Sequence, residues 1–425
     1  MDSWRRAEVP SLPGRGPVPK LRDTATGELM PAAAGPVAAI YVCGITPYDA
    51  THMGHAATYL AWDLLVRALL DAGVTVSYVQ NVTDVDDPLL ERADRDGEDW
   101  RELAARETQL YRTDMEALRV LPPDHLVGAV EAMPLIERYN QRLAERGALY
   151  NVDDDVYFAR SADLAFGALS GPGTVSDYGA GRMRELFSER GGDPARPGKK
   201  DALDALVWRA ERPGEPSWPS AFGPGRPGWH VECAAIAAEY LGVRFDVQAG
   251  GNDLIFPHHE MSASHARVAF AGEPHVFARL YAHAGLVGYQ GEKMSKSLGN
   301  LVFVSRLLAD GVDPMAIRLT LLARQYRECW EWTGEALNAA AVRLNRWRRA
   351  VTMGAPAVPS AQPVLAEVRA AMSEDLDAPR ALAAIDAWAE AVLAEAGSTG
   401  ARGAPDHDDV RLVRLIADSL LGVVL

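Results

Sequence analysis

The chain has 425 residues, of which 48% are hydrophobic, and it carries a net charge of −15 at pH 7. A chain of this length can bury a large core and indicates more than one domain. The acidic balance argues against a long polyanion such as tRNA as the main partner, because such proteins usually present a broad basic surface, although a local basic patch stays open.

Residues 1–36 are expected to form an irregular arm that is able to wrap the body of the protein. Residues 37–43 are a continuous apolar run, which is typical of a buried parallel strand. Residues 55–70 then place apolar side chains at the spacing of an amphipathic helix closed by Gly73, and residues 74–82 predict the next strand. Strand, helix and strand in this order predict a right-handed βαβ unit, the opening of a doubly wound α/β sheet.

Residues 84–118 are expected to be helical and charged on one side, and the stretch that follows is broken by Gly and Pro. Strand signals return at 245–248 and 281–287. From Asp313 the sequence predicts an almost entirely helical region. Two linker-like segments interrupt it, at 356–363 and 397–406.

These patterns predict an α/β protein with a Rossmann-type catalytic domain, an insertion and a C-terminal helical bundle. The expected parts are an arm (1–36), the first half of the catalytic domain (37–121), a connective insertion (122–200), the second half of the catalytic domain (201–312) and a helical domain (313–425).

Neither a membrane-spanning run nor a secretory signal is evident, since the charged start of the chain continues into a Pro- and Gly-rich stretch. The three cysteines, Cys43, Cys233 and Cys329, are too scattered for a disulfide framework, so reduced thiols or metal ligands are the better interpretation. We therefore expect a cytoplasmic protein that is not bound to a membrane.

Two short basic motifs are the most informative feature of the sequence, His52-Met53-Gly54-His55 and Lys293-Met294-Ser295-Lys296-Ser297. The first opens a predicted helix, where backbone N–H groups and imidazoles can face an anion. The second is a Gly-flanked loop with two point charges that suit phosphate. Either motif alone is weak evidence, but together and in this order they predict a site that binds ATP, expels pyrophosphate and forms an aminoacyl adenylate.

Cys43, Cys233 and His258 are candidate metal ligands. Cys43 ends the first predicted strand, and strand ends of such a sheet converge on the ligand crevice, so distant residues can meet there. A set of two cysteines and one histidine leaves a fourth tetrahedral position for water or substrate, which is the catalytic pattern of zinc. Without C-x-x-C spacing, however, the residues alone favour cysteines that pack as small hydrophobic side chains, and Cys329 keeps that interpretation.

Several segments resemble the cysteinyl-tRNA synthetase superfamily, including its HIGH and KMSKS motifs. They are Tyr41-Val42-Cys43-Gly44, His52-Met53-Gly54-His55, and residues 81–87, 225–233, 250–260 and 293–297, so the resemblance spans most of the chain. Ser262 stands where the synthetases usually supply a glutamate as a fourth zinc ligand, and Pro88 stands where they commonly have lysine. Little chain follows the helical region for an anticodon-binding domain. Residues 189–194, Glu-Arg-Gly-Gly-Asp-Pro, resemble a signature of a sister family, the mycothiol-pathway cysteine ligases.

The sister family joins L-cysteine to the amine of glucosaminyl-inositol through a cysteinyl adenylate, which releases pyrophosphate and AMP. The resemblance implies one Zn²⁺ per chain on Cys43, Cys233 and His258, with the substrate sulfur as fourth ligand. A soft metal that prefers a thiolate separates cysteine from serine, which a hydrophobic pocket does poorly. It also implies Mg²⁺ with ATP, and that His52, His55, Lys293 and Lys296 neutralise charge on the leaving pyrophosphate.

Further residues are expected to line the cysteinyl adenylate, most of them at strand ends. They are Gly44, Ile45, Thr46, Thr58, Asn81, Val82, Thr83, Trp229, Gly251, Asn252, Asp253 and Val287. For Asn81 and Thr83 an ordinary strand-end cap stays open, and for Trp229 simple packing. Asp84, Asp86 and Asp87 are interpreted as a solvated helix start and not as a metal site.

Three functional classes are compared. The favoured one is the sugar-amine ligase, with L-cysteine, ATP and glucosaminyl-inositol as partners, no tRNA, and a monomeric state. The second is a short cysteinyl-tRNA synthetase, for which a basic tRNA-binding face would be the discriminating feature. The third is a silent binding protein, which the intact ATP motifs disfavour. The acceptor pocket is expected to have residues 189–194 near its rim, with a structural turn as the alternative.

Overall fold

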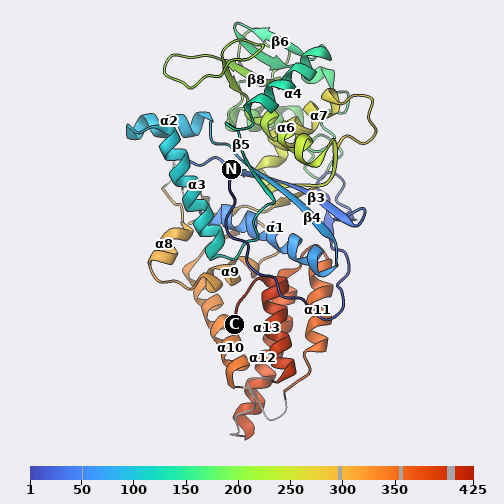
Figure 1. Ribbon diagram of the computed structural model, residues 1–425, viewed down its shortest axis with the longest axis vertical. Helices are drawn as coiled ribbons and strands as arrows, with labels where there is room; N and C mark the ends of the chain where they lie inside the picture. Colours follow the sequence, from blue (N-terminus) through green and yellow to red (C-terminus); the bar gives the residue numbers. More distant parts are fainter. Residues whose placement is uncertain (50, 295–298, 354–357, 400–406) are drawn as a thin grey trace.

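The computed structural model in Figure 1 describes residues 1–49, 51–294, 299–353, 358–399 and 407–425. Three parts follow one another along the long axis. A small sheet with its helices lies at one end, a parallel sheet lies in the middle, and a helical bundle forms the other end. In the part of the chain that these ranges cover, no helix is both long and apolar enough to cross a membrane.

The central sheet confirms the predicted doubly wound α/β fold. Its five strands are parallel and lie in the order β11-β10-β3-β4-β5. They are β3 (Val37–Ile45), β4 (Thr75–Val82), β5 (His125–Gly128), β10 (Arg244–Gly251) and β11 (Phe277–Ala284). The chain first builds the sheet outward from β3 and later returns to place β10 on the other side of β3. The strand order therefore reverses beside β3, and in such sheets ligands bind at the carboxyl ends of the strands at this point.

Alternate side chains of β3 enter two different cores. Ile40 and Val42 face α1 (Met53–Asp71) and the helical bundle, whereas Tyr41 and Cys43 face α6 (Trp229–Leu241) on the other side of the sheet. This alternation follows from the period of two residues in a strand. It directs the Cys43 thiol toward the helix that carries Cys233.

The prediction that residues 84–118 are helical is confirmed, with a break in the middle. Two helices occupy this stretch, α2 (Asp87–Asp96) and α3 (Trp100–Ala117). Gly97 ends α2 in the left-handed conformation at φ 66°, and the Asp99 side chain caps α3 by accepting hydrogen bonds from two backbone N–H groups. A glycine C-cap followed at once by an acidic N-cap is a strong stop and restart signal.

The small sheet is antiparallel, in the order β6-β7-β8-β9, and it is packed with helices at the end of the molecule away from the bundle. Its elements are α4 (Met133–Glu145), β6 (Leu149–Val152), β7 (Asp155–Phe158), α5 (Ala180–Glu189), β8 (Ala205–Ala210) and β9 (Gly225–Pro227). The expected insertion at 122–200 therefore overlaps the central sheet through β5, while β8 and β9 follow it. The division of the chain at 36, 121, 200 and 312 stays a prediction.

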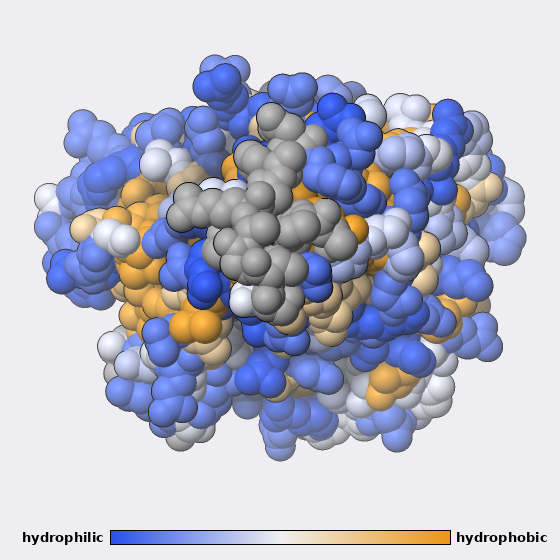
Figure 2. All heavy atoms as spheres, turned by 90° about the horizontal axis from the view of Figure 1, so that it is seen from below, coloured by the Kyte–Doolittle hydropathy of each residue, from blue (hydrophilic) through white to orange (hydrophobic). Residues whose placement is uncertain are grey.

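The remaining elements complete the arm, the region after β11 and the bundle. They are β1 (Lys20–Arg22), β2 (Leu29–Pro31), α7 (Glu260–Ala269), β12 (Val287–Tyr289), β13 (Glu292–Lys293), α8 (Val304–Ala309), α9 (Pro314–Leu322), β14 (Trp330–Glu331), α10 (Gly334–Met353), α11 (Gln362–Ser373), α12 (Ala378–Thr399) and α13 (Asp408–Leu421). Of the two expected linkers, residues 356–357 and 400–406 lie outside the described residues. Figure 2 views the bundle end, where hydrophilic residues cover much of the face between smaller apolar patches.

The arm is fastened to the body at several points. The amino group of Met1 donates to the carbonyl of Leu126 and pairs with Glu131 at 2.7 Å, and the buried indole of Trp4 donates to the carbonyl of Val120. These contacts hold the start of the chain against β5 and the segments on either side of it.

A buried ionic cluster joins the bundle to α1. Asp63 of α1 pairs with Arg67 one turn later, at 2.8 Å, and with Arg318 of α9, and all three side chains are fully buried. Arg67 also donates to the carbonyls of Asp418 and Ser419 at the end of α13. The carboxylate and the carbonyl acceptors thus compensate two buried guanidinium charges.

Candidate active site

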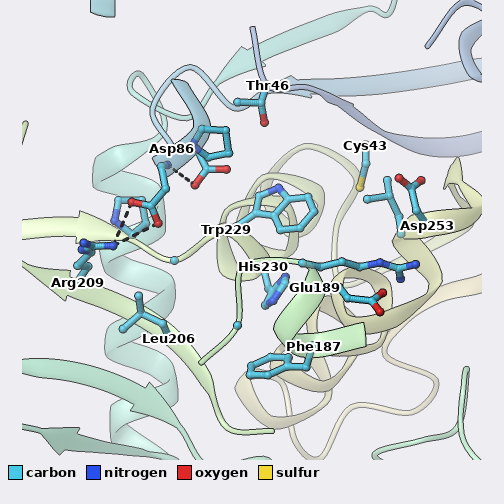
Figure 3. Close-up of a pocket in the computed structure, with 18 of the residues that line it drawn as sticks. Cys43, Thr46, Asp86, Phe187, Glu189, Leu206, Arg209, Trp229, His230 and Asp253 are labelled. Carbon is cyan, nitrogen blue, oxygen red and sulfur yellow. Dashed lines mark hydrogen bonds and ion pairs between the residues drawn. The ribbon is translucent and has the colours of Figure 1, made fainter. Parts of the chain in front are cut away.

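A cavity of about 850 Å³ lies at the carboxyl ends of β3 and β10 and extends beneath the small sheet (Figure 3). Its inner wall comes from the central sheet and α1 and includes Cys43, Gly44, Ile45, Thr46, His55, Thr58, Gly251 and Asp253. Its outer wall comes from the small sheet and the segment after α5. That wall includes Tyr157, Phe187, Glu189, Arg190, Gly191, Gly192, Asp193, Arg196, Leu206 and Arg209. One continuous space therefore joins the switch point of the sheet to a polar outer chamber.

Cys43, Cys233 and His258 meet beside the inner end of this cavity. Their ligand atoms all lie within 4.8 Å of one another, and all three residues are buried. The two sulfurs are 3.8 Å apart, and two thiolates on a tetrahedral zinc with bonds near 2.3 Å stand roughly this far apart. Nε2 of His258 is buried and has no hydrogen-bond partner among the described residues. An orphaned imidazole nitrogen beside two sulfurs fits a metal ion in chemistry and in spacing.

The pKa values of the two thiols are shifted in opposite directions. Burial raises the pKa of Cys43 well above its usual value. Burial acts in the same direction on Cys233, but the hydrogen bond from Cys43 and the nearby His258 outweigh it, so the pKa of Cys233 is well below its usual value. Cys233 is therefore the thiol more readily available as a thiolate, the form that binds metal.

A chain of hydrogen bonds runs from Cys43 to the N-terminal arm. Cys43 Sγ lies 3.2 Å from His259 Nε2, His259 Nδ1 lies 2.7 Å from His283 Nε2, and His283 Nδ1 lies 2.7 Å from Thr24 Oγ1. Burial lowers the pKa of both histidines, to about 3 for His283, so each ring is neutral and carries one N–H. When Cys43 is a thiolate, Thr24 donates to His283, His283 donates to His259, and His259 donates to the sulfur. Sequence reasoning missed these partners, and the doubled histidine at 258–259 was the sole signal for them.

Trp229 and His230, at the start of α6, form the wall between the metal set and the rest of the cavity. The indole of Trp229 stacks on the His258 ring at 4.2 Å with an interplanar angle of 26°, and His230 Nδ1 lies 3.0 Å from His258 Nδ1. Ser262, at the position where a fourth ligand was considered, donates its hydroxyl to the carbonyl of His230. Trp229 thus both faces the cavity and fixes the orientation of a candidate ligand.

The first basic motif caps α1. Nδ1 of His52 accepts hydrogen bonds from the N–H groups of Gly54 and His55, and the rings of His52 and His55 stack at 3.8 Å. His55 and Thr58 line the cavity, so the N-terminus of α1 faces it. The chain beyond the lysine loop returns to this point, because Phe303 forms an antiparallel bridge with His52.

The second basic motif is described in part. Lys293 ends β13, where its backbone pairs with Gly288 of β12. Lys296 lies outside the described residues. The described chain on the far side of this motif returns to the start of α1 at Phe303.

The other predicted site residues divide into two groups. Gly44, Ile45, Thr46, Thr58, Trp229, Gly251 and Asp253 line the cavity, whereas Asn81, Val82, Thr83, Asn252 and Val287 are not among its lining residues. Asn81 accepts a hydrogen bond from the N–H of Gly44 at 2.9 Å and donates to Thr83. A Cβ atom on Gly44 would lie 1.5 Å from the carbonyl oxygen of Asn81, so only glycine fits there. These contacts brace the strand end that forms the cavity wall.

The acidic triplet after β4 differs in part from its expected role. Asp86 does start a helix, since its carboxylate accepts from the N–H of Asp87 at 2.8 Å. The turn is only partly open to solvent, because all three aspartates are half-buried, and burial raises the pKa of both Asp84 and Asp86 to about 6. Asp87 pairs with Arg209 at 3.0 Å and with Arg226. The helix start is therefore confirmed, whereas its solvation is reduced by the arginines of the small sheet and by the cavity wall.

Residues 189–193 form both a turn and part of the cavity wall. Arg190 donates to the carbonyl of Phe256, two residues before the candidate ligand His258. Asp193 accepts from Lys199 at 2.8 Å and from the hydroxyl of Tyr157. A Cβ atom on Gly192 would lie 2.4 Å from the Phe187 ring, which excludes larger residues. The segment is rigidly anchored, and its inner surface faces the outer chamber.

Comparisons with known proteins agree with this geometry. A family model described as the tRNA synthetases class I (C) catalytic domain matches residues 30–342. Proteins of Thermomonospora curvata and Saccharomonospora viridis are 61% and 58% identical to this chain, with 100% of each chain covered in both cases. A protein of Streptomyces griseus is 58% identical, again with 100% of both chains covered. All three are named L-cysteine:1D-myo-inositol 2-amino-2-deoxy-alpha-D-glucopyranoside ligase.

Among solved structures, methionyl-tRNA synthetase of Mycobacterium tuberculosis in complex with methionyl-adenylate is similar, with a TM-score of 0.65. The match covers 91% of this chain and 92% of that one at 17% identity, so it shows a shared fold.

Proposed function

This chain belongs to the family of class I (C) tRNA synthetase catalytic domains, and we propose that it ligates L-cysteine to the amine of glucosaminyl-inositol with consumption of ATP. The products are the cysteinyl amide, AMP and pyrophosphate, in a step of mycothiol biosynthesis. The ligase relatives match over their whole length and that of this chain, whereas the synthetases are related at the level of the superfamily. The observation that carries the proposal is the continuous cavity, which has one end suited to cysteine and nucleotide and a separate polar chamber for an acceptor.

The cysteine end is formed by Cys43, Cys233 and His258, which would hold one Zn²⁺. Bound there, zinc would supply a soft Lewis acid that prefers the thiolate of cysteine over the hydroxyl of serine. The hydrogen bonds that Cys43 accepts from Gln248 and His259 orient its sulfur and spread its charge. The chain itself thus fixes where the substrate sulfur must lie.

The nucleotide end is the N-terminus of α1. The positive end of the helix dipole and the stacked rings of His52 and His55 suit an anion, and Mg²⁺ would accompany ATP. The cysteine carboxylate attacks the α-phosphorus, and pyrophosphate leaves with the bonding electron pair. No covalent bond to the protein is needed, so catalysis consists of positioning and charge neutralisation, with Lys293 and Lys296 as further cations.

A Lys296→Ala variant should lose roughly 2–4 kcal/mol of transition-state stabilisation, comparable to deletion of one preorganised donor. Cysteine-dependent exchange of labelled pyrophosphate into ATP measures this loss without tRNA or amino sugar. Lys20→Ala, at an exposed position in the arm, is the control and should exchange like the wild type. An unchanged rate in Lys296→Ala would show that the loop does not act in adenylate formation.

The acceptor end is proposed to be the outer chamber, with residues 189–193 in its wall. A neutral polyol that bears an amine needs hydrogen-bond donors and acceptors, and this chamber offers Tyr157, Asp193, Arg196 and backbone groups of two glycines. The alternative acceptor, tRNA, is disfavoured by the net charge of −15, because a polyanion is attracted by a broad basic surface.

Purified protein supplied with cysteine, ATP and glucosaminyl-inositol should form the cysteinyl amide and an equal amount of AMP. Mass analysis of quenched reactions measures both products. In a parallel reaction, tRNA should bind weakly, with an affinity that falls steeply as salt is added, since only phosphate contacts would hold it. Accumulation of cysteinyl-tRNA with the amino sugar left unused would reverse the assignment and make the chain a short cysteinyl-tRNA synthetase.

We also propose that the enzyme is a cytoplasmic monomer. All three cysteines are free thiols, which suits a reducing compartment. Light scattering coupled to size exclusion measures the mass in solution directly.

A further inference from the structure

Asp86 differs from three other aspartates that line the cavity. Asp87 pairs with Arg209, Asp155 pairs with Arg212 at 2.9 Å, and Asp193 pairs with Lys199 at 2.8 Å. Among the described residues, the Asp86 carboxylate accepts a hydrogen bond from the N–H of Asp87, and it forms no ion pair. A carboxylate that is not neutralised by a cation keeps its capacity to accept a proton.

Asp86 lies where the two ends of the cavity meet. Figure 3 shows its carboxylate directed toward Trp229, with Thr46 on the same side of the indole. Trp229 stacks on His258, and Thr46 follows the strand end that carries Cys43, so this part of the wall adjoins the cysteine end. An acyl group activated at that end and an amine that enters from the outer chamber would come together beside Asp86.

We propose that the Asp86 carboxylate is the catalytic base that accepts the proton of the acceptor amine as the amide bond forms; this assignment rests on the ligase function proposed above. The free amine attacks the acyl carbon of the cysteinyl adenylate, and a C–N bond forms. The C–O bond to phosphate breaks, and AMP leaves with its electron pair. The nitrogen gives one proton to Asp86, which later releases it to water.

The surroundings of Asp86 suit this task. Burial raises its pKa to about 6, with Asp87 acting in the same direction and Arg226 and His258 acting against it. Tyr48, in the loop after β3, and Glu232, in α6, also feel its charge. A base whose pKa lies close to the working pH is ionised and still binds a proton well during the transfer.

The position of Asp86 at a helix cap allows a substitution that separates its structural role from its role as a base. Asparagine caps helices about as well as aspartate, so Asp86→Asn keeps the hydrogen bond to the N–H of Asp87 and removes only the proton acceptor. Asp86→Ser, which also retains a capping oxygen, serves as a second variant if the first one does not fold. Asp99→Asn is the matched control, because Asp99 caps α3 in the same manner and does not line the cavity.

The experiment measures each half of the reaction in the wild type and in these variants. Pyrophosphate exchange reports adenylate formation, and single turnover of preformed adenylate at saturating glucosaminyl-inositol reports amide formation. In Asp86→Asn and Asp86→Ser, exchange should stay within about threefold of the wild type, while amide formation should fall about 100-fold or more. Asp99→Asn should leave both rates unchanged.

Two results would overturn the assignment. Amide formation by Asp86→Asn at nearly the wild-type rate would show that another group takes the proton, and an equal loss in both half-reactions would place Asp86 in adenylate formation instead. A failure of the ligase function itself looks different, since the wild type would then exchange pyrophosphate and yet form no amide.

Discussion

The wild type is expected to carry about one Zn²⁺ per chain, and the Cys233→Ser variant should be purified without it, because serine replaces a soft thiolate with a hard hydroxyl. Loss of an outer partner of a ligand typically weakens metal binding 10–100-fold, so loss of a ligand should exceed about 100-fold. Exchange of pyrophosphate that depends on cysteine should disappear with the metal. Metal analysis and the exchange assay measure the two effects.

Cys329→Ser is the matched control for this variant. Cys329 is exposed and lies in the region of β14, where its sulfur accepts a hydrogen bond from the N–H of Leu286. This variant should keep its zinc and its activity. Full zinc occupancy in Cys233→Ser would remove Cys233 from the ligand set, and the 3.8 Å separation of the two sulfurs would then reflect packing alone.

The Asp63→Asn variant should be the most destabilised of the single substitutions considered, by about 3–5 kcal/mol, since it leaves two buried guanidinium groups without their carboxylate. Arg67 and Arg318 are both fully buried against Asp63. Urea denaturation measures the free energy of unfolding. Asp310→Asn is the control, because its partner Arg306 is 77% exposed and surface pairs contribute about 0–1 kcal/mol. Equal losses in both variants would show that burial of the cluster adds nothing.

The same cluster sets the response of stability to acid. Burial alone would raise the pKa of Asp63, but Arg318 and Arg67 outweigh burial, and the pKa lies below its usual value of 3.8. A carboxylate with a depressed pKa stabilises the fold above the unfolded value and loses this contribution as pH falls through the folded value. The difference in stability between the wild type and Asp63→Asn should therefore be full at neutral pH and shrink below about pH 4.

The central sheet was predictable because its signals are local. The apolar run at 37–43 and the periodic helix that follows it specify a βαβ unit, and the structure extends them by only a few residues, to Ile45 and to Met53. The small sheet was not predicted, since strands such as β9 (Gly225–Pro227) are too short to show a period and lie among glycine and proline. The helical character of 84–118 was predicted, but the break at Gly97 was not specified, because the charged pattern continues on both sides of it.

The site was predictable only where a short sequence motif contains the residues that act together. His52 and His55 are close in sequence, and their stacking follows from a single helix start. Cys43 and Cys233 are separated by 190 positions, so their residue types alone favoured packing, and the resemblance to known enzymes supplied the metal interpretation. Thr24 contacts His283 across 259 positions, and no local pattern encodes such a contact. The helix start at Asp86 was predicted, but its partial burial was not, because that depends on segments distant in sequence.

The buried ionic cluster between α1 and α13 has a consequence for the order of folding during synthesis. Arg67 donates to the carbonyls of Asp418 and Ser419, which follow it by 351 and 352 residues. Translation at about 5–20 residues per second leaves this guanidinium without these acceptors for roughly 20–70 s after it is synthesised. Asp63 of the same helix pairs with the guanidinium from the start, but the bonds to α13 form only after the last helix has been made. The packing of α1 against the bundle is therefore completed late.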